Sequence, residues 1–309
     1  MLISVILPAY NVQDTIGESI DSILSQTFTD FELIIINDGS QDNTEEVILA
    51  YSDKRIRYYQ NEQNKGLIYT LNRGLDLAQG KYIARMDADD VSLPTRFEKQ
   101  VKVMEENSNI VVCGTLIEPF GVKGTEKIEM LLLEKSDDIK DCLFLRSCFA
   151  HPTVMIRKKV LVDNNVRYNL DYPYAEDYRM WIDLSFLGDF YNIQEPLLRY
   201  RLSEGQVSSK YKNNQRYTAL ICRRSYISRR LRDSCLDRMI ELGVDVKTIQ
   251  YIKQKKYSKQ LIELSYFSLA YYDLKSFLYL FVSGDFIRFK FLTLLALVNR
   301  FFVAKYKLI

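Results

Sequence analysis

Several features that mark exported or membrane-spanning proteins are missing from this sequence. Its five cysteines, Cys113, Cys142, Cys148, Cys222 and Cys235, form no Cys-x-x-Cys pair, and such a scattered, odd-numbered set predicts buried thiols in a reducing compartment. The first residues carry no basic segment, and their apolar run is too short for a signal peptide. No stretch reaches about 18 apolar residues, so we expect no membrane-spanning helix and a cytoplasmic protein.

Two common phosphate-binding motifs are also absent. The chain has no Gly-x-Gly-x-x-Gly segment and no Walker-A lysine. If it binds a nucleotide, a glycine loop at a helix N-terminus therefore does not hold the phosphates, and a metal ion is needed in its place.

What is present is the composition of a globular protein with an uneven distribution of charge. The chain has 309 residues, 47% hydrophobic and 27% charged. Residues 210–309 hold 20 Lys and Arg against 7 Asp and Glu, whereas residues 1–209 hold 22 against 33. We therefore expect an acidic catalytic domain over 1–209 and a basic, helical region over 210–309.

Buried strands and helices alternate along the first ninety residues. Apolar runs predict strands, and apolar residues at helical spacing predict helices. The expected strands are 3–7, 31–36, 56–59 and 82–86, and the expected helices are 15–25, 42–51 and 67–78. This order predicts an α/β fold with a Rossmann-like, mostly parallel sheet and helices on both faces, in which ligands bind beyond the carboxyl ends of the strands.

Three carboxylates, Asp87, Asp89 and Asp90, follow the fourth strand directly. Like charges this close repel, and burial strengthens the repulsion, which a divalent cation would remove. Alternate residues of an extended segment point the same way, so Asp87 and Asp89 can reach one ion. An ion that keeps positions open for phosphates is Mg²⁺ or Mn²⁺. The alternative is a solvated acidic turn before the helix that Pro94 opens.

Four segments of the chain, in this order, resemble the conserved blocks of family 2 glycosyltransferases. They are Pro8-Ala-Tyr-Asn11, Ile-Ile-Ile-Asn-Asp38-Gly-Ser40, Asn64-Lys-Gly66 with Leu71-Asn-Arg-Gly74, and Asp87-Ala-Asp-Asp90. The resemblance covers about residues 3 to 203. It implies the GT-A fold and inverting transfer of a sugar from a nucleotide-sugar donor.

On the donor side, the resemblance implies roles for residues at the ends of the first strands. Pro8, Tyr10 and Asn11 are expected to line the nucleotide pocket, and Asp38 to recognise the base, usually uracil. Arg73 lies in the matching donor-side helix, where an exposed structural arginine is the alternative. Ordinary turn chemistry is likewise the alternative explanation of the Asp-Gly-Ser sequence at Asp38.

The same resemblance assigns a separate role to each aspartate of the acidic segment. Asp87 is expected to contact the donor sugar or ribose, Asp89 to hold the metal on the diphosphate, and Asp90 to assist one of them. Many relatives carry a histidine near Ser203 that approaches the metal or the diphosphate, and this chain has none there. Arg201 is predicted to neutralise phosphate instead.

Glu176 and Asp177 begin a predicted helix on the acceptor side. Acids at a helix start are stabilised by the helix dipole, which is the structural explanation. The resemblance implies that Asp177 is the general base and Glu176 its neighbour or an acceptor ligand. Inversion at the anomeric carbon requires such a base, because the acceptor hydroxyl must lose its proton as it attacks.

Four further side chains belong to this acceptor-side region. Tyr174 and Tyr178 are expected to touch sugar, and Trp181 to lie in the core. His151, the only histidine, is expected to be either a structural hydrogen-bonding residue or, by the resemblance, a secondary part of the acceptor site.

The basic region after residue 210 has two interpretations. A predicted helix from about Asn214 to Arg232 carries several arginines, and the apolar stretch 291–304 is flanked by lysines and arginines. Such a pattern is typical of binding to an anionic membrane surface, or of a helical appendage or homo-oligomer contact. Nucleic acid is not expected, since no recognition motif is present.

The sequence thus predicts a metal-dependent inverting glycosyltransferase acting on a glycan or polyprenyl-linked acceptor in cell-surface polysaccharide synthesis, at the inner face of the membrane. Its donor is expected to be a UDP-sugar. One alternative is a sugar-nucleotide nucleotidyltransferase, which would need a glycine- and arginine-rich loop that residues 9–17 lack. The other is a non-catalytic binding or assembly subunit that has kept the fold.

Overall fold

The computed structural model describes residues 1–122, 132–202, 211, 213–223, 225, 226 and 229. Met1–Cys222 form one compact unit. The predicted domain boundary at residue 209 stays a prediction, and the predicted region after it lies mostly outside the described residues. The basic helix expected from about Asn214 is present over 213–223. None of the described helices is long and apolar enough to cross a membrane.

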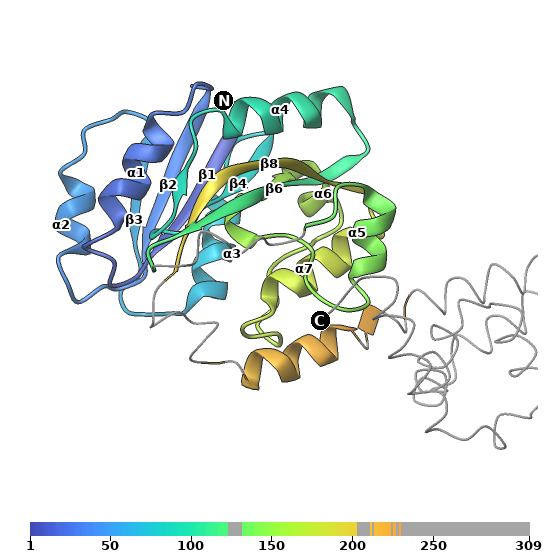
Figure 1. Ribbon diagram of the computed structural model, residues 1–309. Coiled ribbons are helices and arrows are strands. Elements are labelled where there is room, and N and C mark those ends of the chain that lie inside the picture. Colours follow the sequence, from blue (N-terminus) through green and yellow to red (C-terminus); the bar gives the residue numbers. More distant parts are fainter. Residues whose placement is uncertain (123–131, 203–210, 212, 224, 227–228, 230–309) are drawn as a thin grey trace, which may run out of the picture. The chain divides into compact units, whose positions relative to one another are not determined.

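An eight-stranded sheet forms the centre of the described part, with strand order β3-β2-β1-β4-β7-β6-β8-β5 (Figure 1). The strands are β1 (Ile3–Ala9), β2 (Phe31–Asn37), β3 (Ile56–Gln60), β4 (Tyr82–Arg85), β5 (Val91–Ser92), β6 (Ile110–Phe120), β7 (Met155–Arg157) and β8 (Asp189–Arg201). The first four are mutually parallel, as predicted. The second half is mixed, because β7 is antiparallel to β4 and β6, and β5 is antiparallel to β8.

The helices surround this sheet (Figure 1). They are α1 (Ile16–Leu24), α2 (Thr44–Leu49), α3 (Leu67–Leu77), α4 (Arg96–Glu106), α5 (Ser136–Cys142), α6 (Lys158–Asp163) and α7 (Glu176–Leu184), with a 3₁₀ turn η2 at His151–Thr153. The four cysteines of the described part are buried, as predicted, and none of them is in a disulfide.

Helices cover both faces of the parallel half because β1 is apolar on both. Val5 and Leu7 belong to a buried cluster with Ile20 of α1 and Phe97 of α4. The opposite face meets α3 at Gly74, where an added Cβ would lie 2.5 Å from Cγ2 of Ile6. Strands buried on both faces read as continuous apolar runs, which is why they were predictable.

Two elements differ from expectation. The sequence does not predict α5, which forms in the charged segment from Glu134 to Asp141 and buries Ile139 and Cys142. Charged residues outnumber apolar ones in this seven-residue helix, so the sequence pattern does not reveal its apolar face. The long strand β8 is also not predicted, because polar residues and Pro196 interrupt its apolar pattern.

Candidate active site

The carboxyl ends of four parallel strands meet at one edge of the sheet. Ala9 is in register with Asn37, Asn37 with Gln60, and Ile6 with Arg85. The loops that follow β1, β2, β3 and β4 therefore lie along this edge, where ligands of α/β sheets bind. The structure thus brings together the three polar clusters that the sequence predicts at strand ends.

Asp38 is a buried carboxylate that holds the loop after β3. Its Oδ1 accepts hydrogen bonds from Nδ2 of Asn61 at 2.6 Å and from the backbone N–H of Lys65 at 2.9 Å, and its Oδ2 accepts one from Gly66 at 2.9 Å. An ionised carboxylate has about four acceptor positions, so one remains for a further donor. Asp38 is therefore fixed in place before any ligand arrives.

Arg73 supports Asp38 through Asn61. Its Nη1 donates to Oδ1 of Asn61 at 2.5 Å and to the carbonyl of Gln60 at 2.7 Å. The amide of Asn61 in turn donates to Asp38. Asn61 was not among the predicted site residues, although an asparagine directly after a strand of the parallel sheet was the available signal.

The loop after β1 is tied to the loop after β2. The backbone N–H of Asn11 donates to Oγ of Ser40 at 3.0 Å, and Oδ1 of Asn11 accepts from the N–H of Gln41 at 2.8 Å. Asn11 has φ of +51°, a left-handed conformation that asparagine tolerates. Pro8 is half-buried within β1, whereas Tyr10 is exposed at the rim. These are the positions predicted to face the nucleotide.

Gly39 closes the turn between β2 and this rim, and its replacement tests the turn. Gly39 has φ of +71°, and an added Cβ would lie 2.6 Å from the carbonyl carbon of Gln63. We expect Gly39→Ala to destabilise the protein by roughly 3–4 kcal/mol, since left-handed strain adds to a clash with backbone. Urea unfolding followed by circular dichroism measures this.

Gly66 is the matched control for that experiment. It has φ of +87°, but an added Cβ would meet nothing within 4 Å. Gly66→Ala should therefore cost only the backbone strain, about 1–3 kcal/mol, because φ of 87° with ψ of 159° is a conformation that almost only glycine adopts. Equal losses for the two variants would contradict the predicted clash.

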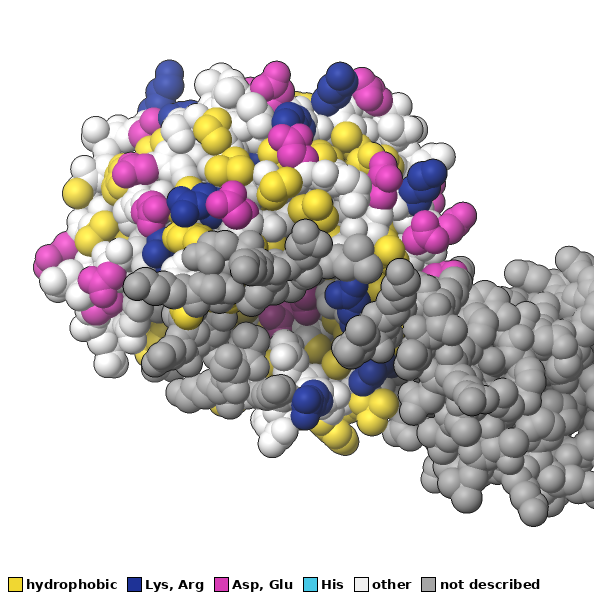
Figure 2. Space-filling model, viewed as in Figure 1, with side chains coloured by type: hydrophobic (Ala, Val, Ile, Leu, Met, Phe, Trp, Pro, Cys, Tyr) yellow, Lys and Arg dark blue, Asp and Glu magenta, His cyan; other side chains and the backbone are white. Residues whose placement is uncertain are grey.

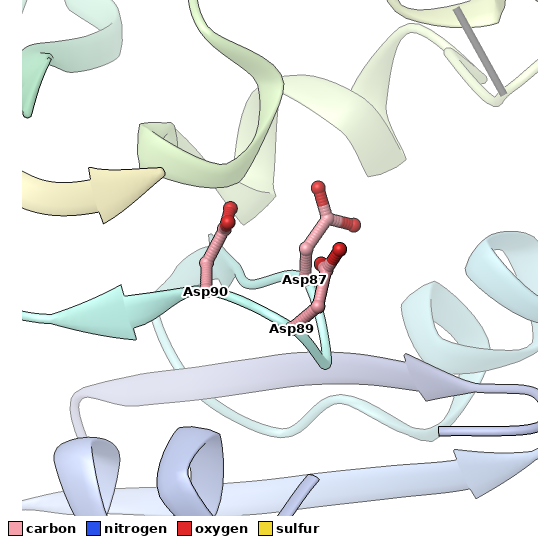
Figure 3. Close-up of side chains that lie close together, drawn as sticks. All are labelled: Asp87, Asp89 and Asp90. Atoms are coloured by element: carbon pink, nitrogen blue, oxygen red, sulfur yellow. The ribbon is translucent and has the colours of Figure 1, made fainter. Parts of the chain in front are cut away.

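Asp87, Asp89 and Asp90 form a tight acidic loop. One carboxylate oxygen of each lies within 4.8 Å of the others, and all three side chains project to the same side of the loop (Figure 3). Burial and the charge of Asp87 raise the pKa of Asp89 to about 6. Burial and the two neighbouring charges raise the pKa of Asp90 to about 9. The fold thus keeps these three carboxylates close together despite their mutual repulsion.

Arg201 anchors the acidic loop. Its backbone N–H donates to Oδ1 of Asp90 at 2.8 Å, and its Nε donates to the carbonyl of Asp89 at 2.7 Å. Its guanidinium also pairs with Glu18 and lies over the ring of Phe120. Arg201 therefore has a structural role that the sequence did not indicate, in addition to its predicted contact with phosphate.

The side chains of this loop are suitable ligands for a hard divalent cation. It offers three carboxylates on one side, and Oδ2 of Asp90 is buried with no hydrogen-bond partner among the described residues. Mg²⁺ and Mn²⁺ prefer carboxylate oxygens, and their charge would relieve the repulsion that raises the pKa values of Asp89 and Asp90.

Glu176 and Asp177 open α7, and both are held in a buried setting. Oγ of Ser147 donates to Oδ2 of Asp177 at 3.2 Å. Burial raises the pKa of Asp177, and burial together with the charge of Asp177 raises the pKa of Glu176 to about 7. Just before them, Tyr174 has φ of +65°, and its ring stacks on Tyr211 with the ring centres 4.5 Å apart.

The pair on α7 and the acidic loop lie near each other because both surround Arg85. Its guanidinium pairs with Asp87. Its charge also lowers the pKa of Glu176 and of Asp177, and the charge of Asp87 raises the pKa of Glu176. The acids predicted for metal binding and those predicted for proton transfer thus lie near one arginine. Figure 2 shows that some acidic side chains lie deeper than the surface around them.

Two other side chains of the acceptor region are buried in the core, and a third is hydrogen-bonded within the fold. Tyr178 is buried and donates to the carbonyl of Leu143, so the expectation that it touches sugar is wrong. Trp181 is fully buried, as predicted. His151 is hydrogen-bonded to the hydroxyl of Tyr168 at 2.9 Å, and burial lowers its pKa well below the usual range, so both of its predicted roles stay open for a neutral imidazole.

Comparison with known proteins identifies the family and supports the fold. A family model described as glycosyl transferase family 2 matches residues 4–164. The chain belongs to glycosyltransferase family 2. An uncharacterized glycosyltransferase of Haemophilus influenzae is 36% identical over 289 residues, which cover 90% of each chain. The predicted family and enzyme class are confirmed, and the nucleotidyltransferase alternative is set aside.

Other relatives of this glycosyltransferase are named for a diphosphoundecaprenol-linked acceptor and for O-antigen biosynthesis. The UDP-Glc:alpha-D-GlcNAc-diphosphoundecaprenol beta-1,3-glucosyltransferase WfgD of Escherichia coli is 31% identical over 224 residues, covering 70% of this chain and 83% of WfgD. The O-antigen biosynthesis glycosyltransferase WbnJ of E. coli is 37% identical over 209 residues, covering 65% and 80%.

Solved structures agree on the GT-A fold. Staphylococcus aureus TarS 1–349 in complex with UDP-GlcNAc superimposes with a TM-score of 0.60 at 18% identity, covering 87% of this chain and 81% of TarS. Glucosyl-3-phosphoglycerate synthase of Mycobacterium tuberculosis, in complex with Mn²⁺, UDP and phosphoglyceric acid, gives 0.52 at 20% identity, covering 72% and 78%.

Proposed function

We propose that this glycosyltransferase is a metal-dependent, inverting enzyme that transfers a sugar from a UDP-sugar to a hydroxyl of a glycan or polyprenyl-linked acceptor. The pathway class is cell-surface polysaccharide synthesis. The observation that carries the proposal is the meeting of two sets of carboxylates, from the acidic loop and from α7, around Arg85.

Asp87 and Asp89 are the residues that would hold Mn²⁺ or Mg²⁺. A bound cation would neutralise charge on the departing nucleoside diphosphate. The chain itself contributes the placement of these carboxylates, because Arg201 fixes the loop through the carbonyl of Asp89 and the carboxylate of Asp90. Arg201 is further proposed to offset phosphate charge at the edge of this loop.

The nucleotide would lie along the ends of β1 and β2, between Tyr10, Asn11 and Asp38. The remaining acceptor position of Asp38 suits the imide N–H of uracil, and its three internal hydrogen bonds hold it ready for that contact. The E. coli relative WfgD is named for UDP-glucose, and the TarS crystal contains UDP-GlcNAc. Both support a uridine nucleotide as the donor.

Asp177 is proposed to take the proton of the acceptor hydroxyl. As the acceptor oxygen bonds to the anomeric carbon, the bond from that carbon to the phosphate oxygen breaks and the proton passes to Asp177. Burial makes the carboxylate more basic, whereas the hydrogen bond from Ser147 and the charge of Arg85 favour its ionised form. Glu176 beside it is proposed to position the acceptor.

A lipid-linked acceptor would require access to a membrane surface. Within the described residues, helix 213–223 exposes Tyr217 and Leu220 beside Arg216. An apolar side chain with a neighbouring cation is the pattern of interfacial helices, which supports peripheral contact with an anionic membrane. A homo-oligomeric contact by the basic region remains the alternative proposal.

Metal-dependent nucleotide binding tests the proposed function. We expect UDP and UDP-sugars to raise the melting temperature of the full chain in the presence of Mn²⁺ but not in EDTA, since a ligand at 100 times its Kd adds about 2.7 kcal/mol. GDP and dTDP sugars serve as comparison ligands. Stabilisation that is equal in EDTA, or failure to hydrolyse or transfer sugar from any donor, would contradict the proposal.

A further inference from the structure

Arg85 is a buried arginine whose side chain is only partly used by the fold. It is the last residue of β4, and only 4% of it is exposed. Its backbone N–H donates to the carbonyl of Val154, and its Nη2 pairs with Asp87. Its Nε and Nη1 have no hydrogen-bond partner among the described residues. Arginine has five N–H donors in a rigid fork, so more than half of them are idle.

Neighbouring Arg96 shows what a purely structural arginine does in this core. It is fully buried, and its Nε, Nη1 and Nη2 contact Oε1 of Gln100, Sδ of Met86 and the carbonyl of Arg85. A buried donor without a partner costs free energy that a fold-stabilising residue does not need to lose. The idle donors of Arg85 therefore point to a second arrangement in which acceptors reach them.

The acidic groups around Arg85 include Asp90 of the same loop, whose Oδ2 has no hydrogen-bond partner among the described residues, and the carboxylates of α7. The charge of Arg85 acts on both Glu176 and Asp177, so these groups lie within its electrostatic reach. Asp87, which pairs with the guanidinium of Arg85 in this structure, is also a proposed ligand of the divalent cation. A cation that engages Asp87 competes with Arg85 for the same oxygens.

We propose that Arg85 is a positioning residue that links the acidic loop to α7. It holds Asp87 while the loop carries no cation, and it turns its donors to Glu176 and Asp177 when a divalent cation takes over Asp87. Binding of a cation to the acidic loop and alignment of the general base are thereby coupled through the side chain of Arg85. This inference rests on the proposed metal site and base of the preceding section.

Removal of the guanidinium should change metal affinity in the direction opposite to activity. We expect Arg85→Met to bind Mn²⁺ about three- to tenfold more tightly than the wild type, because a competing cation is gone. At the same time kcat should fall by at least about tenfold, because α7 loses its partner. Titration of free Mn²⁺ by electron paramagnetic resonance, without nucleotide, gives the affinity independently of turnover.

The pH profile supplies a second readout. Asp177 faces Glu176 on its own helix, Arg85 on β4, and the hydroxyls of Ser147 and Tyr168. Arg85 is the cation in this set, and it lowers the pKa of Asp177. Its loss should raise that pKa, so the acid limb of kcat/KM should move up by on the order of one pH unit. A residue that only fills space would not move this limb.

Three variants keep the test decisive. Arg85→Lys retains the charge and should keep the acid limb near that of the wild type, even if Arg85→Met folds poorly. Arg55→Met removes an arginine that pairs with Asp53 at 2.7 Å at the other end of the parallel strands, and it should change neither readout. Melting curves of all variants show that the measured chains are folded.

The outcomes separate this inference from the function on which it rests. A wild-type protein that binds Mn²⁺ and transfers sugar, with unchanged Mn²⁺ affinity and acid limb in Arg85→Met, would overturn only the role of Arg85. Weaker Mn²⁺ binding in that variant would do the same. A wild-type protein that binds no Mn²⁺ would overturn both.

Discussion

Replacement of Asp177 by asparagine should lower kcat by about 10²–10⁴-fold while the affinity for UDP with Mn²⁺ stays unchanged. Asparagine has nearly the same shape and can still accept the hydrogen bond from Ser147. It cannot take a proton, and general-base catalysis contributes about this factor. Steady-state kinetics with a competent donor and acceptor give kcat, and calorimetry gives the nucleotide affinity.

Asp183 on the same helix is the matched control for this variant. It pairs with Arg179 at 2.7 Å, one turn apart on α7. Asp183→Asn removes the same charge from the same helix, and kcat should stay within about twofold because an i,i+4 pair contributes little to stability. A loss of kcat in Asp177→Asn no larger than in Asp183→Asn would rule out Asp177 as the base.

Replacement of Asp89 by asparagine should have opposite effects on function and on stability. Loss of one carboxylate should weaken Mn²⁺ binding by about 100-fold or more, since ligand charge sets the affinity of hard cations. Without metal, however, the variant should be more stable than the wild type by about 2 kcal/mol at pH 7.5, because burial and the charge of Asp87 disfavour the ionised Asp89.

The pH dependence of this gain has a definite sign. The pKa of Asp89 is about 6 in the folded protein, above the ordinary value of 3.8. The ionised group therefore destabilises the fold above pH 6, and this penalty fades as the pH falls from 6 towards 4. Unfolding of the metal-free proteins in urea at pH 7.5, 4.5 and 3.5 should show a difference that falls to about a third at pH 4.5 and has nearly vanished at pH 3.5.

Asp76 provides the control for Asp89. It is exposed on α3 and pairs with Arg167 at the surface. Asp76→Asn should leave both Mn²⁺ binding and stability nearly unchanged. If Asp89→Asn bound Mn²⁺ as tightly as Asp76→Asn does, the acidic loop would not be the metal site.

The donor half of the fold was predictable because its information is local. Apolar runs such as Ile3–Leu7 and Phe31–Ile36 mark strands buried on both faces, and polar residues such as Asp38 and Asp87 follow where the strands end. The edge on which they meet follows from the parallel order alone. Helical spacing also placed Trp181 in the core, and the same spacing would have placed Tyr178 there, three residues earlier on the buried stripe of α7.

What escaped prediction depends on contacts between distant parts of the chain. Arg201 reaches Asp89 and Asp90 across more than a hundred residues, through a strand whose pattern is broken by polar residues. Asn61 and Arg73 act on Asp38 through a relay that no motif spacing records. Arg85 looks like an ordinary strand residue until its unused donors and surrounding acids are seen together.

The pairing of β5 with β8 has a consequence for the order in which the enzyme is made. Val91, directly after the acidic loop, is in register with Arg199, and Arg201 fixes the loop itself. A nascent chain that has left the ribosome only as far as α7 carries all the acids of the proposed site but not the strand that fixes Asp89 and Asp90. Assembly of the proposed catalytic centre is thus deferred until nearly the whole sheet has been synthesised, so an incomplete translation product lacks the support of the acidic loop.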